Sequence, residues 1–132
     1  MLKLLSSMAF VGVILLLHSA WAQAPAVDPQ SLVGEWQGEW KWSRNPAAVN
    51  GRYYLTIHKV NSDKVYGKVE FSGGPFRPPY DVEGKLEGNI LKYSSLDKQV
   101  SAELVITGNT MTGLSVRVGV AGSFDITATK RK

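Results

Sequence analysis

The sequence predicts an all-β protein, an antiparallel eight-stranded up-and-down (meander) barrel. Three observations carry this prediction. Short runs rich in Val, Ile, Thr, Tyr and Phe recur between turn residues at close, regular spacing, which is typical of sandwiches and barrels. No amphipathic helical stretch of useful length follows the N-terminal segment. Glycines recur within the predicted strands, where they allow the sharp bending that a small closed barrel needs.

The N-terminal segment, residues 1–22, has the pattern of a signal peptide. A positive start at Met1-Leu2-Lys3 precedes an apolar run, and Ala20-Trp21-Ala22 is the small-x-small pattern that signal peptidase cleaves. The apolar run is short for a membrane span of about 20 residues, and no positive cluster follows it. We therefore expect an exported protein, periplasmic or secreted, without a stable membrane anchor. Residues 23–33 are expected to form a flexible lead-in and residues 34–132 one barrel domain.

The amino-acid composition indicates what stabilises the domain and which classes of binding partner are expected. The chain has no cysteine, so the stability of this exported domain must come from its core and its sheet. The formal net charge is +4, and most basic residues are scattered among acids. Only Lys130-Arg131-Lys132 forms a basic cluster, which is too small to indicate a nucleic-acid-binding surface. We expect no nucleic acid partner.

Short turns join the predicted strands. The connections at 61–63, 88–89 and 108–109 contain Asn, Gly, Asp or Ser, residues that suit the backbone of tight hairpins. Consecutive strands are therefore expected to be antiparallel neighbours. The predicted strands are Gly34–Ser43, Arg52–Val60, Lys64–Phe71, Tyr80–Glu87, Asn89–Ser95, Gln99–Thr107, Thr110–Val118 and Ser123–Lys130.

The first strand separates an inside from an outside. Alternate side chains of a strand point to opposite faces, so Trp36, Trp40 and Trp42 share one face. That face is either core or the wall of a ligand pocket, and both interpretations remain open. A two-residue turn at 88–89 would place Leu86 opposite Leu91. The same alternation predicts an interior made of Leu55, Ile57, Val65, Gly67, Val69, Phe71, Val82, Leu86, Leu91, Tyr93, Val100, Ala102, Leu104, Ile106, Phe124, Ile126 and Ala128.

One stretch breaks the alternation. Carrying the register past Gly113 would place Ser115 and Arg117 inside the barrel and three aliphatic side chains outside, namely Leu114, Val116 and Val118. We favour a β-bulge near Gly113, which would return the aliphatic side chains to the core. The alternative is an exposed apolar stripe that forms a dimer or partner surface. In that case Arg117 would require an acidic ligand or an internal carboxylate.

The two ends of the domain carry a family resemblance. The run Gly34-Glu35-Trp36, the eight meander strands and a basic residue at the end of the last strand (Lys130 or Arg131) resemble the calycin group, which comprises lipocalins, fatty-acid-binding proteins, avidins and small bacterial lipocalin-like proteins. The resemblance implies that Trp36 closes one end of the barrel and packs against Arg131, a cation–π contact of order 1 kcal/mol. The chain is shorter than a typical lipocalin, lacks its disulfide and C-terminal helix, and shows no avidin-like set of biotin-binding residues.

Two binding functions fit this barrel. The first is a carrier or sensor of a small hydrophobic or aromatic ligand, with a site formed by Trp40, Trp42, Tyr93 and Phe76. The second is an envelope protein-interaction module, an inhibitor or accessory subunit with a filled barrel. It would act through the 73–80 loop, with Phe76, Arg77 and Tyr80, or through the Leu114, Val116 and Val118 face. An open apolar cavity of a few hundred Å³ favours the carrier, whereas a packed interior favours the module.

Catalysis has little support in the sequence. His58 is the only histidine of the expected mature chain, and it falls on the outer face with Tyr54 and Thr56. No Ser-His-Asp arrangement, metal-ligand cluster or phosphate-binding loop occurs in the sequence. We expect a protein that is not an enzyme and that holds no metal and no cofactor.

Overall fold

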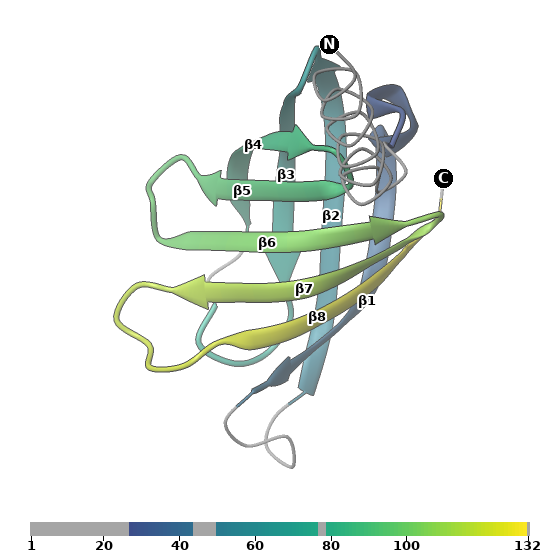
Figure 1. Ribbon diagram of the computed structural model, residues 1–132. Helices are drawn as coiled ribbons and strands as arrows, with labels where there is room; N and C mark the ends of the chain where they lie inside the picture. The colour runs from purple at the N-terminus through teal and green to yellow at the C-terminus, as the bar shows by residue number, and fades with distance from the viewer. Residues whose placement is uncertain (1–26, 44–49, 77–78, 132) are drawn as a thin grey trace, which may run out of the picture.

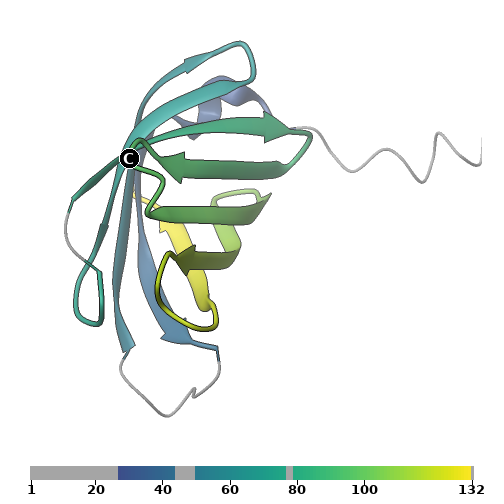
Figure 2. The same ribbon diagram turned by 90° about the vertical axis from the view of Figure 1, so that its left-hand side faces the viewer.

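The computed structural model describes residues 27–43, 50–76 and 79–131, which form a closed barrel of eight antiparallel strands in sequence order (Figure 1). This confirms the predicted fold class, and Figure 2 shows how the sheet curls round on itself. Each predicted strand is present, with its ends within two residues of the prediction. The strands are β1 (Gly34–Trp42), β2 (Asn50–Asn61), β3 (Lys64–Phe71), β4 (Tyr80–Glu87), β5 (Ile90–Ser95), β6 (Val100–Thr107), β7 (Thr110–Arg117) and β8 (Phe124–Lys130).

The tight turns set the register as expected. Ser62, Gly88 and Gly108 have positive φ angles of 61°, 63° and 59°, the conformation that short hairpins require. Leu86 pairs with Leu91 across β4 and β5. The meander then closes because β1 pairs with β2 on one side and with β8 on the other.

The predicted bulge near Gly113 is wrong. The pairing of β6 with β7 runs without a shift along the whole of β7, and Gly113 lies opposite Leu104. Glycine is needed there for a different reason, since a Cβ at Gly113 would lie 2.0 Å from the carbonyl oxygen of Glu103 on the neighbouring strand. The register shift occurs instead in β2, between Ile57 and Lys59. The aliphatic side chains after Gly113 therefore stay outside.

The core fills the inside of the barrel. Every residue of the predicted interior set is buried, and Trp36, Trp40 and Tyr53 are among the largest side chains with almost no exposed surface. Trp42, on the same face of β1, is only half-buried. Within the described ranges, no helix is long and apolar enough to cross a membrane.

A short 3-10 helix, η1 (Pro29–Leu32), covers one end of the barrel. The Asp28 side chain accepts a hydrogen bond from the backbone N–H of Gln30 at 3.1 Å and so caps η1. Leu32 is buried, and its carbonyl accepts the indole N–H of Trp36 at 3.0 Å. The end of the predicted lead-in is thus ordered. The predicted signal peptide, residues 1–22, lies outside the described residues.

The closing pair at this end differs from the expected one. Lys130, not Arg131, lies over the Trp36 ring, with its Nζ 6.0 Å from the ring centroid. Lys130 also donates a hydrogen bond to the carbonyl of Ser31. Arg131 is exposed, and its backbone N–H donates to the Glu35 carbonyl at 2.7 Å. The alternation along β8 explains the exchange, because Lys130 is the residue paired with Trp36.

Candidate functional site

Three of the four predicted ligand-binding aromatics, Trp40, Trp42 and Phe76, lie in a packed cluster. Phe76 stacks on Phe71 with ring centroids 3.8 Å apart and planes 10° apart. Trp40 meets Phe76 and Phe124 edge-on at 5.5 and 5.3 Å. Trp42 meets Phe124 in the same way at 4.7 Å. The edge-on contacts are within the range of favourable aromatic pairs, and the Phe71–Phe76 stack is closer still, so the rings pack directly on one another.

Trp40 is fixed in this cluster. Its indole N–H donates a hydrogen bond to the carbonyl of Ser72 at 2.9 Å. A Cβ at Gly74 would lie 2.5 Å from the Trp40 ring, so the backbone of this loop packs directly on the indole. Trp40 is therefore a structural side chain, whereas Trp42 keeps an exposed part.

Tyr93 lies inside the barrel, where its hydroxyl is 2.8 Å from that of Tyr53. Both side chains are buried, and burial raises the pKa of each hydroxyl above the ordinary tyrosine value. The two hydroxyls thus stay protonated at neutral pH and satisfy each other. Tyr53 has the same parity as Leu55 on β2, and this was the available sequence signal for a second interior tyrosine.

The tyrosine pair yields a stability prediction. We expect Tyr53→Phe to lower the free energy of unfolding by about 1–3 kcal/mol, because the Tyr93 hydroxyl then stays buried without a partner. The double variant Tyr53→Phe, Tyr93→Phe removes both polar groups and should lose much less than the sum of the two single losses. Urea denaturation of the four proteins measures the coupling. Additive losses would contradict the paired arrangement.

The 73–80 loop turns its aromatic residues inward. Phe76 and Tyr80 are both buried, at 7% exposure each. Arg77, the third residue predicted to contact a partner, lies outside the described residues. In this conformation neither the Phe76 ring nor the Tyr80 ring offers a free surface to a partner.

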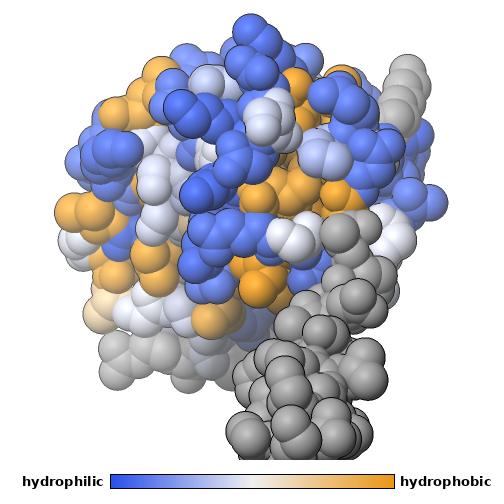
Figure 3. All heavy atoms as spheres, turned by 45° about the horizontal axis from the view of Figure 1, so that its top comes forward, coloured by the Kyte–Doolittle hydropathy of each residue, from blue (hydrophilic) through white to orange (hydrophobic). Residues whose placement is uncertain are grey.

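The outer face of the barrel is apolar at the end of β7 and just after it. Leu114, Val116 and Val118 are 48%, 45% and 60% exposed, and we call these three residues the aliphatic stripe. Leu96 and Val105 add further exposed aliphatic surface on the connection after β5 and on β6. Figure 3 shows hydrophobic residues set among hydrophilic ones over the front of the barrel. The stripe is the surface that the uninterrupted register of β7 predicts.

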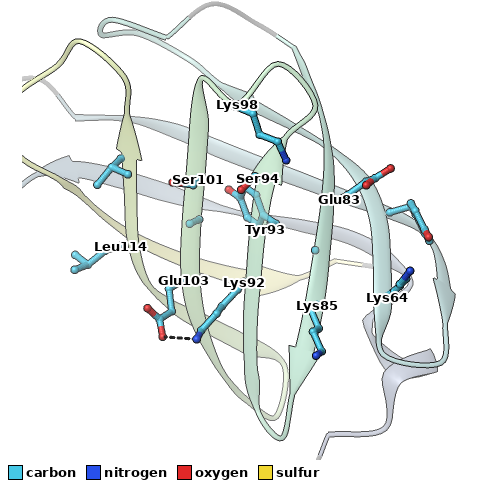
Figure 4. Close-up of a pocket in the computed structure, with 14 residues that line it drawn as sticks. Lys64, Glu83, Lys85, Lys92, Tyr93, Ser94, Lys98, Ser101, Glu103 and Leu114 are labelled. Atoms are coloured by element: carbon cyan, nitrogen blue, oxygen red, sulfur yellow. Dashed lines mark ion pairs between the residues drawn. The ribbon is translucent and has the colours of Figure 1, made fainter.

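A groove adjoins the aliphatic stripe on the outside of the barrel. It has a volume of about 670 Å³ and crosses β3 to β7, and Figure 4 shows its lining. Leu114 and Val116 belong to both the stripe and the groove, so the two features are continuous. We call it the basic groove because lysines outnumber acids in its lining. It is lined by the outward-facing residues Lys64, Tyr66, Glu83, Lys85, Lys92, Ser94, Ser101, Glu103, Leu114 and Val116, and by Lys98 of the loop after β5. Gly84, Tyr93 and Ala102 also border it, since this inward row of the sheet runs between the two outward rows.

Two residues after Gly113, Ser115 and Arg117, have inward parity in the unshifted register of β7, and they differ in their hydrogen bonding. Ser115 is buried, and its hydroxyl donates to the Ser101 carbonyl at 2.9 Å. The Arg117 Nε is buried and has no hydrogen-bond partner in the described part of the chain. The Asp97 carboxylate accepts the Ser95 hydroxyl at 2.6 Å instead, and this hydrogen bond lowers the pKa of Asp97. The nearby charge of Arg117 lowers this pKa further, but Asp97 is exposed and so is not the internal carboxylate expected for Arg117.

Two observations concern residues that could take part in catalysis or hold a metal ion. His58 is exposed on β2, as its parity predicts. Across residues 27–43, 50–76 and 79–131, no three His, Asp or Glu side chains gather in a way that could hold a metal ion.

Comparisons of the chain with protein-family models, with curated proteins and with solved structures found no match. The functional proposal below therefore rests on the fold and on the surfaces described above.

Proposed function

We propose that this protein is an exported, lipocalin-like barrel that binds a partner protein through its outer face and catalyses no reaction. The observation that carries the proposal is the aliphatic stripe, which exposes two β7 side chains and Val118, just after β7, beside a groove. Exposed apolar surface next to polar groups is typical of protein–protein interfaces. The partner is a second protein of the compartment to which the chain is exported.

The packed interior supports the interaction module over the carrier. A carrier needs an apolar cavity that encloses most of its ligand. Here Trp40, Phe71, Phe76 and Phe124 occupy the end of the barrel where Trp42 lies, and their ring contacts are close. A ligand could enter only if several buried rings moved together, which would sacrifice much of the core.

The stripe also has no structural need to be apolar. Val116 pairs with Ser101, and Leu114 lies between Glu103 on β6 and Asp125 on β8, so the flanking outer positions are polar. Polar residues at positions 114, 116 and 118 would therefore suit a solvated sheet face equally well. Replacing Val116 with threonine, for example, should leave the fold intact, since threonine has a strong strand preference.

Site-specific crosslinking tests the proposal. With a photoreactive residue at position 116, we expect one or a few crosslinked species of defined mass in cells that produce the protein. The matched control carries the same residue at position 39, since Glu39 is exposed on β1. Position 39 should give no such species, and Val116→Thr combined with Leu114→Thr should remove partner binding without changing the unfolding midpoint.

The carrier hypothesis has its own test. If the barrel holds a ligand, the purified protein should retain a small molecule in native mass spectrometry, and lipophilic compounds should shift the emission of Trp42. A retained ligand, or equal crosslinking from positions 116 and 39, would refute the interaction module.

A further inference from the structure

Building on the proposed function, we infer that the partner presents to the basic groove a segment with acidic residues followed by apolar ones. The groove has a direction, because its lining changes in character from β3 to β7. The inference concerns the chemistry of this segment and the way in which it lies on the barrel.

The first observation is a row of cross-strand neighbours. On adjacent strands from β3 to β7, Lys64 pairs with Lys85, Lys85 with Lys92, Lys92 with Glu103, and Glu103 with Leu114. Three lysines thus occupy directly opposed positions on β3, β4 and β5, and in Figure 4 the Lys92 side chain turns toward Glu103. Like charges in directly opposed positions destabilise a sheet. The fold alone does not account for such a row, whereas an anionic partner does.

The acids of the barrel neutralise this row only weakly. Lys85 lies 3.8 Å from Asp63 and 4.0 Å from Glu87, and Lys92 lies 3.8 Å from Glu87 and 4.0 Å from Glu103. All of these side chains are about half exposed or more, and exposed pairs at such distances contribute little. Lys64 makes no ion pair with any described residue. Carboxylates of a partner would therefore meet lysines that remain available.

The second observation is the parallel row beside the first. It runs from Tyr66 through Glu83, Ser94 and Ser101 to Val116. Both rows therefore begin at a lysine or tyrosine on β3 and end at an aliphatic residue of the stripe on β7. Crossing from β3 to β7 covers four strand spacings, or roughly 19 Å, which an extended segment of about six residues spans. Acidic residues near β3 to β5 and apolar residues at β7 match this order.

Charge also argues against a second copy of the chain as the occupant. The groove lining contains four lysines and two glutamates, namely Lys64, Lys85, Lys92, Lys98, Glu83 and Glu103. Two such grooves facing each other would bring like charges together, which disfavours association. An anionic membrane shares the negative charge but not the order of acidic and apolar groups, and the experiment separates it.

The test uses the purified protein and short peptides, with methyl NMR signals of Leu114 and Val116 as reporters. We expect the blocked peptide Glu-Glu-Glu-Leu-Val-Leu to shift both signals saturably and to bind more weakly as salt rises. Peptides with Lys-Lys-Lys or Ser-Ser-Ser in place of the three acids should bind at least about tenfold more weakly. The interleaved order, Glu-Leu-Glu-Val-Glu-Leu, tests the separation of acidic from apolar residues and should also bind more weakly.

Matched charge variants locate the binding. Lys64→Glu combined with Lys85→Glu should weaken binding of the acidic peptide by about tenfold or more. Lys41→Glu combined with Arg131→Glu makes the same change in net charge on β1 and at the C-terminal end, and it should leave binding nearly unchanged. Lys85→Gln should weaken binding while the unfolding midpoint stays the same or rises. It removes two like-charge contacts, with Lys64 and Lys92, and the two ion pairs lost with them are exposed and weak. A fall in both would indicate a structural role and contradict the inference.

Three other outcomes would overturn the acidic segment, and each can be told apart from failure of the proposed protein-binding function. Vesicles of anionic lipid could bind the protein as strongly as the peptide does and lose the same affinity on Lys64→Glu and Lys85→Glu. That result would identify a membrane surface, and not a protein segment, as the ligand of the basic groove. Concentration-dependent dimers in sedimentation that Val116→Thr abolishes would favour a second copy. Discrete crosslinks from position 116 without any binding of the acidic peptide would keep the module and overturn the acidic segment.

Discussion

Replacing Gly38 with alanine is expected to lower the free energy of unfolding by more than about 4 kcal/mol, which exceeds the loss from most single substitutions. A Cβ at this position would lie 1.7 Å from the carbonyl oxygen of Thr127 and 2.6 Å from the Cα of Ala128. Both atoms belong to the backbone of β8, so no side-chain rotation relieves the clash. Since β1 and β8 close the barrel, the substitution forces the seam apart. Urea denaturation followed by circular dichroism measures the loss.

Gly108→Ala is the matched control for this prediction. Gly108 has a φ of 59°, and a Cβ there meets no atom within 4 Å. Alanine at this position suffers only the left-handed backbone conformation, roughly 1–2 kcal/mol. Equal losses at the two positions would show that the steric seam between β1 and β8 is not what makes Gly38 necessary.

Trp40→Ala is expected to cost about 3–5 kcal/mol of unfolding free energy, the range for large aromatic side chains removed from a core. The substitution takes away the edge-on contacts with Phe76 and Phe124 and leaves the Ser72 carbonyl without its indole donor. Because folded domains are stable by only about 5–15 kcal/mol, this loss would leave the barrel close to unfolding at ordinary temperature.

Trp42→Ala is the comparison for Trp40, because both residues lie on the same face of β1. Trp42 is only half-buried and has one edge-on contact, with Phe124. We expect Trp42→Ala to lower the free energy of unfolding by less than half as much as Trp40→Ala, as measured by far-ultraviolet circular dichroism in urea. A larger loss at Trp42 would mean that the exposed end of the cluster, and not its centre, stabilises the barrel.

The strands and the interior could be predicted because alternation is a local property. Once the turns at 88–89 and 108–109 are identified, each inward position follows from its neighbours, and the predicted pairing of Leu86 with Leu91 is correct. The outcome after Gly113 was not predictable in this way. Glycine serves equally in a bulge and in a close approach of two strands, and only the position of the Glu103 carbonyl distinguishes them.

The site was harder to predict for a related reason. Whether the rings of Trp40 and Phe76 form a pocket or fill it depends on distances between residues far apart in the sequence. The lysine row, by contrast, follows from outward parity and hairpin register. Lys85 and Lys92 could have been placed side by side from the turn at 88–89 alone.

The seam between β1 and β8 also bears on how the chain is made. Seven of the eight strand pairings join segments that follow one another, so each can form as soon as its second strand emerges. The eighth joins the first strand to the last, so Trp36 cannot pair with Lys130 until the end of the chain has been synthesised. Until then the backbone of β1 presents an unpaired edge, the feature that most invites association between unfinished chains. A chain truncated before β8 should therefore aggregate rather than persist as an open sheet.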